Sequence, residues 1–229
     1  MNAISHTLDA ELIPERITSL REAMAEVARF QPLYTSFTTP EMQIRGKLIR
    51  RTIPQLIETA MQTQRIQVPA FFTDLKISAS DGISAKAKIP WVRVHSASRA
   101  PRATAGRYLV YLFDNLGKTA FLSLSSGAMK LEKGRYIPRP AEALAQVVEW
   151  ARETLSAQTD IALYTVKPRL GNVRSNLGRT YEKSAIVCIP YEVANLPTDD
   201  QLWSDLTLFL DLLVQIHQAE ADEAAIPTH

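Results

Sequence analysis

The stretch KIPWVRVHSASRAPRATAGRYLVYLFDN spans Lys88 to Asn115 and decides the fold. Its two ends, KIPWVRVHS and RYLVYLFD, are rich in β-branched and aromatic residues, which is typical of strands. The linker ASRAPRATAG (97–106) is small and basic and contains proline and glycine, so it predicts a loop. The stretch therefore predicts two neighbouring antiparallel strands joined by a basic loop.

The strand pattern continues on both sides of this stretch. FFTDLKISAS (71–80) and TAFLSLSS (119–126) predict two more strands, with turns at DG (81–82) and DNLGK (114–118). Further along the chain, DIALYTVKP (160–168) and SAIVCIPYEV (184–193) also predict strands. A loop rich in Gly, Asn and Arg is expected between them, over residues 168–183.

Apolar residues at helical spacing predict four helices, over 8–27, 38–62, 140–157 and 198–219, the first starting near Pro14. The second opens with TTPEM, in which Thr39 can cap the helix and Pro40 can occupy its first position. Pro54 predicts a kink or a restart inside it. Its basic run RGKLIRR is expected on the solvated side, and EADEAAIPTH (220–229) is expected to be a frayed tail or the start of a linker.

This order of elements predicts an α+β fold with a mainly antiparallel sheet flanked by helices. We expect the helical segment of residues 1–65 to pack on a β-rich core formed by residues 66–195. Residues 196–229 then supply the C-terminal helix and an acidic tail or linker.

The formal net charge of +2 hides a strong segregation. Residues 64–184 carry 19 Lys or Arg against nine Asp or Glu, whereas residues 185–229 carry eight acidic residues and no Lys or Arg. A polyanion would therefore be attracted to the middle of the chain. The alternative is a solubilising charge distribution that is uneven by chance.

Several classes of protein lack support in the sequence. No apolar run reaches the roughly 18–20 residues of a membrane span, and the N-terminus does not read as a secretory signal. The single cysteine, Cys188, lies in an apolar run and predicts a buried small side chain in a protein of the reducing cytoplasm. We expect no membrane partner.

Catalytic and cofactor motifs are also missing. The four His are scattered without metal-ligand spacing, and there is no phosphate-binding or dinucleotide-binding glycine motif. SLSSG (123–127) lacks the first glycine of a nucleophile elbow. These absences favour a chain without an active site, metal or cofactor.

The aromatic residues of the opening stretch can instead form a binding surface. Residues four apart on a strand share a face, so Tyr108 and Leu112 point together and Tyr111 points to the other face, which is expected to be the core. If the preceding strand is the antiparallel neighbour, Trp91 lies beside the Tyr108–Leu112 pair. The alternative is that all of these side chains are core residues.

The segments IPWVRV, AGRYLVYLFD and FLSLSSG, followed later by LGRTYEKSAIV, resemble the N-terminal DNA-recognition domain of the McrB family of methyl-directed restriction proteins. The resemblance covers roughly residues 72–192. It implies a domain that binds duplex DNA and flips a modified base, with 5-methylcytosine as the first guess, into a pocket. It also implies a nuclease or NTPase module in the same longer chain or in a partner subunit.

The resemblance assigns roles to particular residues. The pocket positions are Trp91, Tyr108 and Leu112, and Leu177 falls near a further pocket aromatic of the family. In the family, a residue of the loop before PW fills the gap that the flipped base leaves; here that loop, SASDGISAKAK (78–88), offers only Ile83. Contacts to the DNA backbone are expected from basic residues of this loop and of two others: Lys86, Lys88, Arg93, Arg99, Arg102, Lys167, Arg169, Arg174 and Arg179.

Three other functions remain open at this point. The basic aromatic surface would also suit a binder of RNA or single strands without preference for modification. A metal-dependent nuclease with carboxylates from distant segments is a second alternative. The apolar helix over 202–216 would suit an interaction protein that dimerises.

Overall fold

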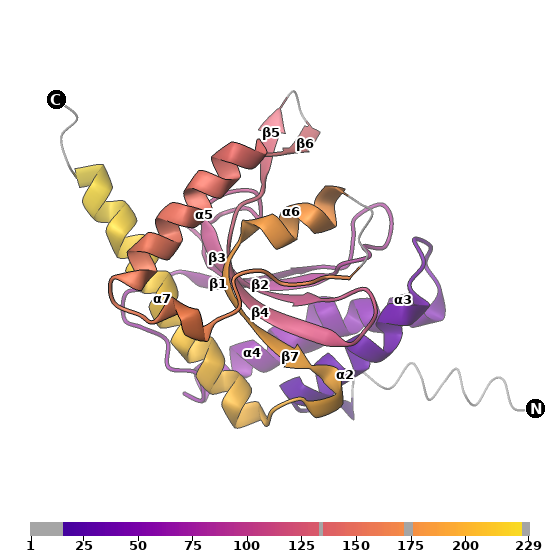
Figure 1. Cartoon of the computed structure of the whole chain (residues 1–229). Coiled ribbons are helices and arrows are strands. Elements are labelled where there is room, and N and C mark those ends of the chain that lie inside the picture. The colour runs from indigo at the N-terminus through magenta and orange to yellow at the C-terminus, as the bar shows by residue number, and fades with distance from the viewer. Residues whose placement is uncertain (1–15, 133–134, 172–175, 226–229) are drawn as a thin grey trace, which may run out of the picture.

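The structure, a computed structural model, describes residues 16–132, 135–171 and 176–225. Five strands form an antiparallel sheet in the order β1-β2-β3-β4-β7, and β5 and β6 form a separate hairpin (Figure 1). The prediction of an α+β fold with a mainly antiparallel sheet is confirmed. The strands are β1 Leu75–Ser80, β2 Trp91–Ser96, β3 Arg107–Phe113, β4 Thr119–Ser126, β5 Met129–Glu132, β6 Arg135–Pro138 and β7 Ala185–Glu192.

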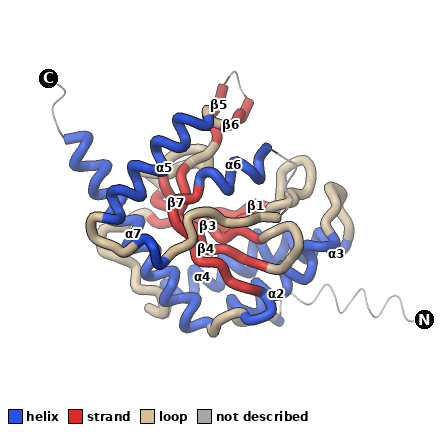
Figure 2. The backbone as a smooth tube through the Cα atoms, in the orientation of Figure 1, coloured by secondary structure: helices blue, strands red, loops and turns tan. Residues whose placement is uncertain are grey.

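The α-helices are α2 Leu20–Phe30, α3 Pro40–Lys47, α4 Ile53–Gln62, α5 Ala141–Ser156, α6 Asn176–Ser184 and α7 Asp199–Ala225. Short 3-10 helices cover Gln31–Leu33, Ile161–Leu163 and Val193–Asn195, and a π-helical turn covers Leu48–Thr52. Figure 2 shows how the helices surround the strands.

The two faces of the sheet are covered differently. Helices α2, α4, α5 and α7 bury one face in a large core that includes Val92, Leu109, Tyr111 and Leu122. The other face carries a smaller apolar cluster that includes Tyr108, and Tyr181 of α6 packs against it. The large core therefore lies on one side of the sheet, and α6 lies on the other (Figure 1).

The predicted helix over 38–62 is present, with a local change at its centre. Thr39 caps it, because its Oγ1 accepts from the Met42 amide at 3.3 Å, and Pro40 is its first residue, as predicted. Leu48–Thr52 forms a π turn, and the Ile53 amide donates to the carbonyl five residues earlier. A wider turn suits Pro54, which has no amide hydrogen and whose ring crowds the preceding turn.

The prediction of one continuous helix at the start of the chain is wrong. It was expected over 8–27, but the chain leaves the helix at residues 17–19 and α2 begins at Leu20; residues 8–15 lie outside the described residues. Ser19 caps α2 by accepting from the Glu22 amide at 3.1 Å. Asp199 of α7 accepts from the Leu20 and Arg21 amides at 3.2 and 2.8 Å, so a distant carboxylate also caps this end.

Three further predictions are corrected in the second half of the chain. The expected strand over 160–168 is a 3-10 turn, capped by Asp160, followed by a single bridge between Thr165 and Cys188. Pro168 cannot donate to a strand ladder, which helps to end the pairing there. The expected loop over 168–183 contains α6, and α7 continues as a helix to Ala225 through part of the expected tail.

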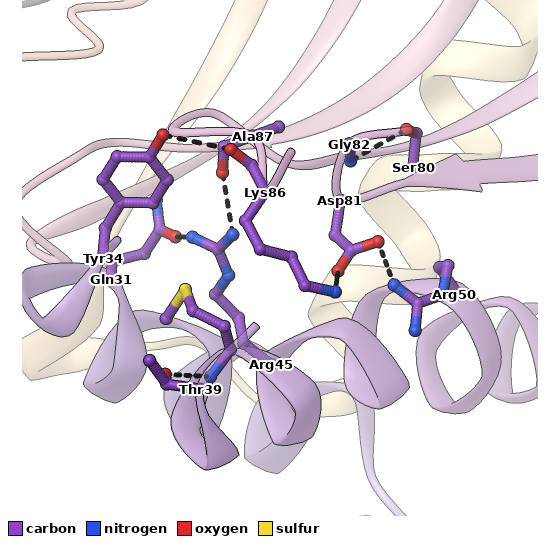
Figure 3. Close-up of polar contacts among 11 residues, drawn as sticks. Gln31, Tyr34, Thr39, Arg45, Arg50, Ser80, Asp81, Gly82, Lys86 and Ala87 are labelled. Carbon is purple, nitrogen blue, oxygen red and sulfur yellow. Dashed lines mark hydrogen bonds and ion pairs between the residues drawn. The ribbon is translucent and has the colours of Figure 1, made fainter. Parts of the chain in front are cut away.

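A buried carboxylate holds the loop that joins β1 to β2. Asp81 is fully buried, and its carboxylate accepts hydrogen bonds from Arg50 and from Lys86, whose Nζ lies at 2.8 Å (Figure 3). Burial alone would raise the pKa of Asp81, but the hydrogen bonds and charges of Arg50 and Lys86 hold it below its usual value. The charged carboxylate therefore ties the loop to the π turn.

A buried arginine holds the other end of this loop. Arg45 donates to the Gln31 side chain at 2.6 Å and to the Ala87 carbonyl at 2.7 Å, and Tyr34 donates to the Lys86 carbonyl at 3.0 Å (Figure 3). Burial lowers the pKa of Arg45 to about 10, so it stays charged at neutral pH. The expectation that the run RGKLIRR lies on the solvated side is therefore wrong for Arg45.

Two glycines permit this close packing. A Cβ at Gly46 would lie 2.4 Å from the Asp81 carboxylate, so helix and loop can meet only where a side chain is missing. Gly82 has a φ of +110°, which glycine adopts without strain, and this lets the loop turn directly after Asp81. Loop position thus depends on both charge and shape.

We expect Asp81→Asn to lower the free energy of unfolding at pH 7 by roughly 2–3 kcal/mol. This is less than the roughly 3–5 kcal/mol of a fully buried pair, because Arg50 remains 43% exposed. Since the folded-state pKa of Asp81 is lowered, its stabilisation is present above its unfolded pKa of about 3.9 and is lost as the pH falls through the folded value. Urea unfolding at pH 7 and at pH 3 measures both effects.

The matched control is Asp200→Asn. Asp200 pairs with Arg65 at the surface and its side chain is 87% exposed, so the expected loss is about 0–1 kcal/mol. Equal losses in the two variants at pH 7 would contradict the role of Asp81 as the anchor of the loop.

Candidate nucleic-acid interface

The register of the sheet brings the predicted trio to one face. Trp91 pairs with Leu112 across β2 and β3, and Tyr108 pairs with Ser125 across β3 and β4. Because side chains alternate along a strand, Trp91, Tyr108 and Leu112 share a face. Tyr111 points to the large core and is 1% exposed, as predicted.

These side chains line a cavity of about 410 Å³. The sheet face forms its floor, and its walls come from the β1–β2 loop, from the loop before β3 and from Tyr181 and Ser184 of α6. Sites for small ligands typically occupy about 300–1,000 Å³ and have mainly apolar linings with a few polar groups. The sheet therefore carries a pocket that is large enough for a nucleobase.

Tyr181 is a pocket residue that the sequence analysis did not assign. Burial raises its pKa to about 12, while a hydrogen bond with Trp91 acts in the opposite direction. Tyr181 belongs to the quoted segment LGRTYEK, but the expectation of a loop over 168–183 hid the helix that carries it. Leu177, the residue proposed instead, lies in the first turn of α6, and its side chain is outside the described part of the structure.

Arg93 lies in the pocket wall and not in the exposed basic loop. Only 4% of it is exposed, and its guanidinium donates to the Ala100 and Pro101 carbonyls at 3.2 and 3.4 Å. The guanidinium also lies 5.3 Å from the centre of the Tyr108 ring, whose hydroxyl donates to the Ala103 carbonyl at 2.8 Å. Burial lowers the pKa of Arg93 and raises that of Tyr108. The pair fixes the basic loop to the pocket.

Comparison with known protein families identifies the family of this chain. Residues 34–218 match the family model described as the MrcB-like N-terminal domain. The chain belongs to this family. The match confirms the resemblance to McrB N-terminal domains and supports a DNA-binding module of a restriction system. No curated protein and no solved structure matches the chain.

The MrcB-like domain presents some of its predicted phosphate contacts to solvent. Among the predicted contacts, the exposed side chains are Arg99, Arg102, Lys167, Arg169 and Arg179. Lys88 is half-buried, and Lys86 is engaged by Asp81, so neither extends freely from the β1–β2 loop. Ile83 of that loop is fully exposed at the pocket rim. Arg174 lies outside the described residues.

The acidic end of α7 takes up part of the positive charge. Arg107 pairs with Glu220, whose carboxylate also bonds His217 at 2.8 Å. Arg99 is exposed, but it donates to the His217 carbonyl at 3.3 Å and lies 5.0 Å from the centre of the Phe71 ring. Glu220 therefore neutralises Arg107 and the His217 carbonyl holds Arg99 against α7, whereas Arg102 extends into solvent.

Neither a metal-binding cluster nor a membrane-spanning helix is found among the described residues. Among them, no group of three His, Cys, Asp or Glu side chains could hold a metal ion. None of the described helices is long and apolar enough to cross a membrane.

Cys188 is fully buried, as predicted, and burial raises its pKa to about 12, so the thiol is not activated as a nucleophile.

We expect the Cys188 thiol to react with an aromatic disulfide reagent at pH 8 at least about a hundredfold more slowly in the folded protein than in denaturant. Burial blocks access, and the raised pKa leaves little thiolate. The absorbance of the released thiolate follows the reaction, and Cys188→Ser gives the blank. Equal rates in the two conditions would show that this strand is open to solvent.

Proposed function

We propose that this chain is the DNA-binding specificity module of a modification-dependent restriction system. It recognises a modified base by holding it, flipped out of the duplex, in the pocket formed by Trp91, Tyr108, Leu112 and Tyr181. The observation that carries this proposal is a cavity of about 410 Å³, lined by three aromatic side chains and Leu112, in a member of the MrcB-like family. Cleavage and nucleotide hydrolysis are then tasks of a nuclease or NTPase module in the same longer chain or in a partner subunit. The whole system works in the cytoplasm.

The energetics favour an aromatic pocket for this purpose. Flipping a base costs a few kcal/mol of lost stacking and pairing. Stacking on an aromatic side chain returns about 1–3 kcal/mol per base. Trp91 is half-buried, and thus combines a fixed position with accessible ring surface. The remaining cost has to be met by hydrogen bonds to the base and by contacts to the DNA backbone.

We take 5-methylcytosine as the first modified base to test. Val110 and Leu112 give the pocket an apolar floor that suits a methyl group. Burying one methyl group returns about 0.8 kcal/mol, so this contact alone discriminates only a few-fold. Stronger discrimination requires that the wrong base leave a buried polar group unpaired.

Backbone contacts are assigned to the exposed cations. Arg102 extends from one side of the pocket, in the loop that also supplies Ala103 and Thr104 to its wall. Another wall is supplied by Tyr181 of α6. The same helix carries Arg179, and the segment before it carries Lys167 and Arg169. Such contacts give affinity that falls with salt and does not depend on the base.

Fluorescence anisotropy on four matched duplexes tests this function. The duplexes are unmodified or carry 5-methylcytosine, 5-hydroxymethylcytosine or N6-methyladenine, each measured at two salt concentrations. The proposal requires tighter binding to one modified duplex, with the preference kept at higher salt. Equal, salt-sensitive binding to all four would contradict it. Tighter binding to single strands, without any effect of modification, would favour a single-strand binder.

Two substitutions separate the pocket from the backbone contacts. Arg102→Ala should weaken binding to modified and unmodified duplexes alike and reduce the slope of affinity against salt by about one phosphate contact.

Trp91→Ala should remove most of the preference for the modified over the unmodified duplex, because it removes the stacking surface. The same anisotropy titrations measure both effects.

The matched control for Trp91 is Trp150→Ala, which removes another half-buried tryptophan, outside the pocket. It should keep the preference. Thermal unfolding of each variant checks that the fold is retained, and Trp91→Leu replaces Trp91→Ala if the smaller side chain does not fold. A folded Trp91 variant with full preference would contradict the role of the pocket.

A further inference from the structure

The pocket contains a buried positive charge. Among the described residues that line the cavity, Arg93 is the single charged one, and only 4% of it is exposed. It follows Trp91 by two residues in β2 and pairs with Val110 of β3. Since side chains alternate along a strand, Arg93 shares the face of the sheet that carries Trp91. The charge therefore belongs to the pocket and not to the outer surface.

No carboxylate of the described residues forms an ion pair with Arg93. Its guanidinium donates instead to the backbone carbonyls of Ala100 and Pro101. The buried Arg45 differs in this respect, because the negative charge of Asp81 acts to raise the pKa of Arg45 and so favours its charged form. A buried charge without an opposite charge costs free energy. A bound anion would offset this cost at Arg93.

Arg93 also has donors to spare. A guanidinium carries five N–H groups in a planar fork, and the two carbonyls use two of them. The Nε atom is buried and has no hydrogen-bond partner among the described residues. The bond from Nη2 to the Pro101 carbonyl is long, at 3.4 Å, so exchanging it for a charge-assisted bond of about 2.8 Å is favourable. A carboxylate can accept from two such donors at once.

We propose that Arg93 makes this pocket selective for a base with an anionic substituent, for which 5-carboxylcytosine is the probe. The inference rests on the function proposed above and names the class of modification. The pyrimidine ring stacks on the aromatic side chains, while its carboxylate accepts from the guanidinium, which lies 5.3 Å from the centre of the Tyr108 ring. A base without this substituent leaves buried donors unpaired, which is the condition for strong discrimination.

The burial of Arg93 favours a base substituent over a phosphate of the flipped nucleotide, which has the same anionic chemistry. Phosphates remain in the DNA backbone, where a cation in solvent can reach them. Arg102 is such a cation, in the loop whose carbonyls Arg93 binds. Arg93 itself is almost completely buried in the lining of the pocket, where a group carried by the base can reach it.

The first test needs only the unchanged protein. Anisotropy titrations compare matched duplexes that carry 5-carboxylcytosine, 5-methylcytosine or unmodified cytosine. The 5-carboxylcytosine duplex should bind roughly ten-fold more tightly than the 5-methylcytosine duplex, as expected for a bidentate contact of arginine with a base.

Substitutions of Arg93 then assign this preference to its charge. Arg93→Met keeps the length of the side chain but removes the charge and the donors, so the ten-fold ratio should fall to about one or lower. Arg93→Lys keeps the charge but not the planar fork, so it should keep part of the ratio. The readout is the ratio between duplexes, because a merely structural role in holding the loop would change all affinities together.

Arg152→Met is the matched control. Arg152 also donates to backbone carbonyls, those of Val166, Ala185 and Ile186, but it lies outside the pocket. This variant should keep the full ratio. Thermal unfolding checks each variant, and Arg93→Lys together with the unchanged protein decides the question if Arg93→Met does not fold.

The outcomes separate this assignment from the function on which it rests. If the unchanged protein distinguishes no modified duplex, 5-carboxylcytosine included, from the unmodified one, both proposals fall. If it prefers another modified base and gains nothing from the carboxylate, only the assignment of Arg93 is overturned. A folded Arg93→Met variant that keeps the ratio would also overturn it, as would equal weakening on all duplexes, which would indicate a phosphate contact or a structural role.

Discussion

The charged carboxylate of Asp81 is the constraint on which the candidate site depends. The β1–β2 loop buries a large apolar side chain only at its end, where Ile89 precedes β2, while Ile83 nearer its start points into solvent. Hydrophobic burial therefore does little to hold the first part of the loop in place. Instead, a buried negative charge between Arg50 and Lys86 ties the loop to a helix, where Gly46 leaves room for the contact. Breaking such a pair leaves an uncompensated buried charge, which makes the loop position robust.

The sheet then performs two tasks because its faces alternate. On one face, Tyr111 and its neighbours are buried by α2, α4, α5 and α7, which supplies the stability of the domain. On the other, Trp91, Tyr108 and Leu112 are covered only in part, by α6 and by loops. A rigid core on one side thus fixes the positions of side chains that remain accessible on the other, as a binding site requires.

The charge segregation seen along the chain is partly cancelled in space. The acidic end of α7 folds back on the basic middle segment, where Glu220 meets Arg107 and hydrogen-bonds His217. At the other end of α7, Asp199 caps α2 and Asp200 pairs with Arg65. The acidic helix therefore neutralises part of the positive charge, while Arg102, in a loop that lines the pocket, stays exposed.

The sequence by itself determined the local structure and the shared face of the pocket residues. Strand alternation placed Tyr108 and Leu112 together, and Thr39 and Pro40 marked the start of their helix, because these signals depend only on near neighbours in the chain. Only the tertiary structure decided that α6 brings Tyr181 into the pocket, that Arg93 is buried and that the Ser36 carbonyl accepts from the Lys86 amide of the β1–β2 loop. These features depend on contacts between distant segments, and neither periodicity nor local capping carries information about them.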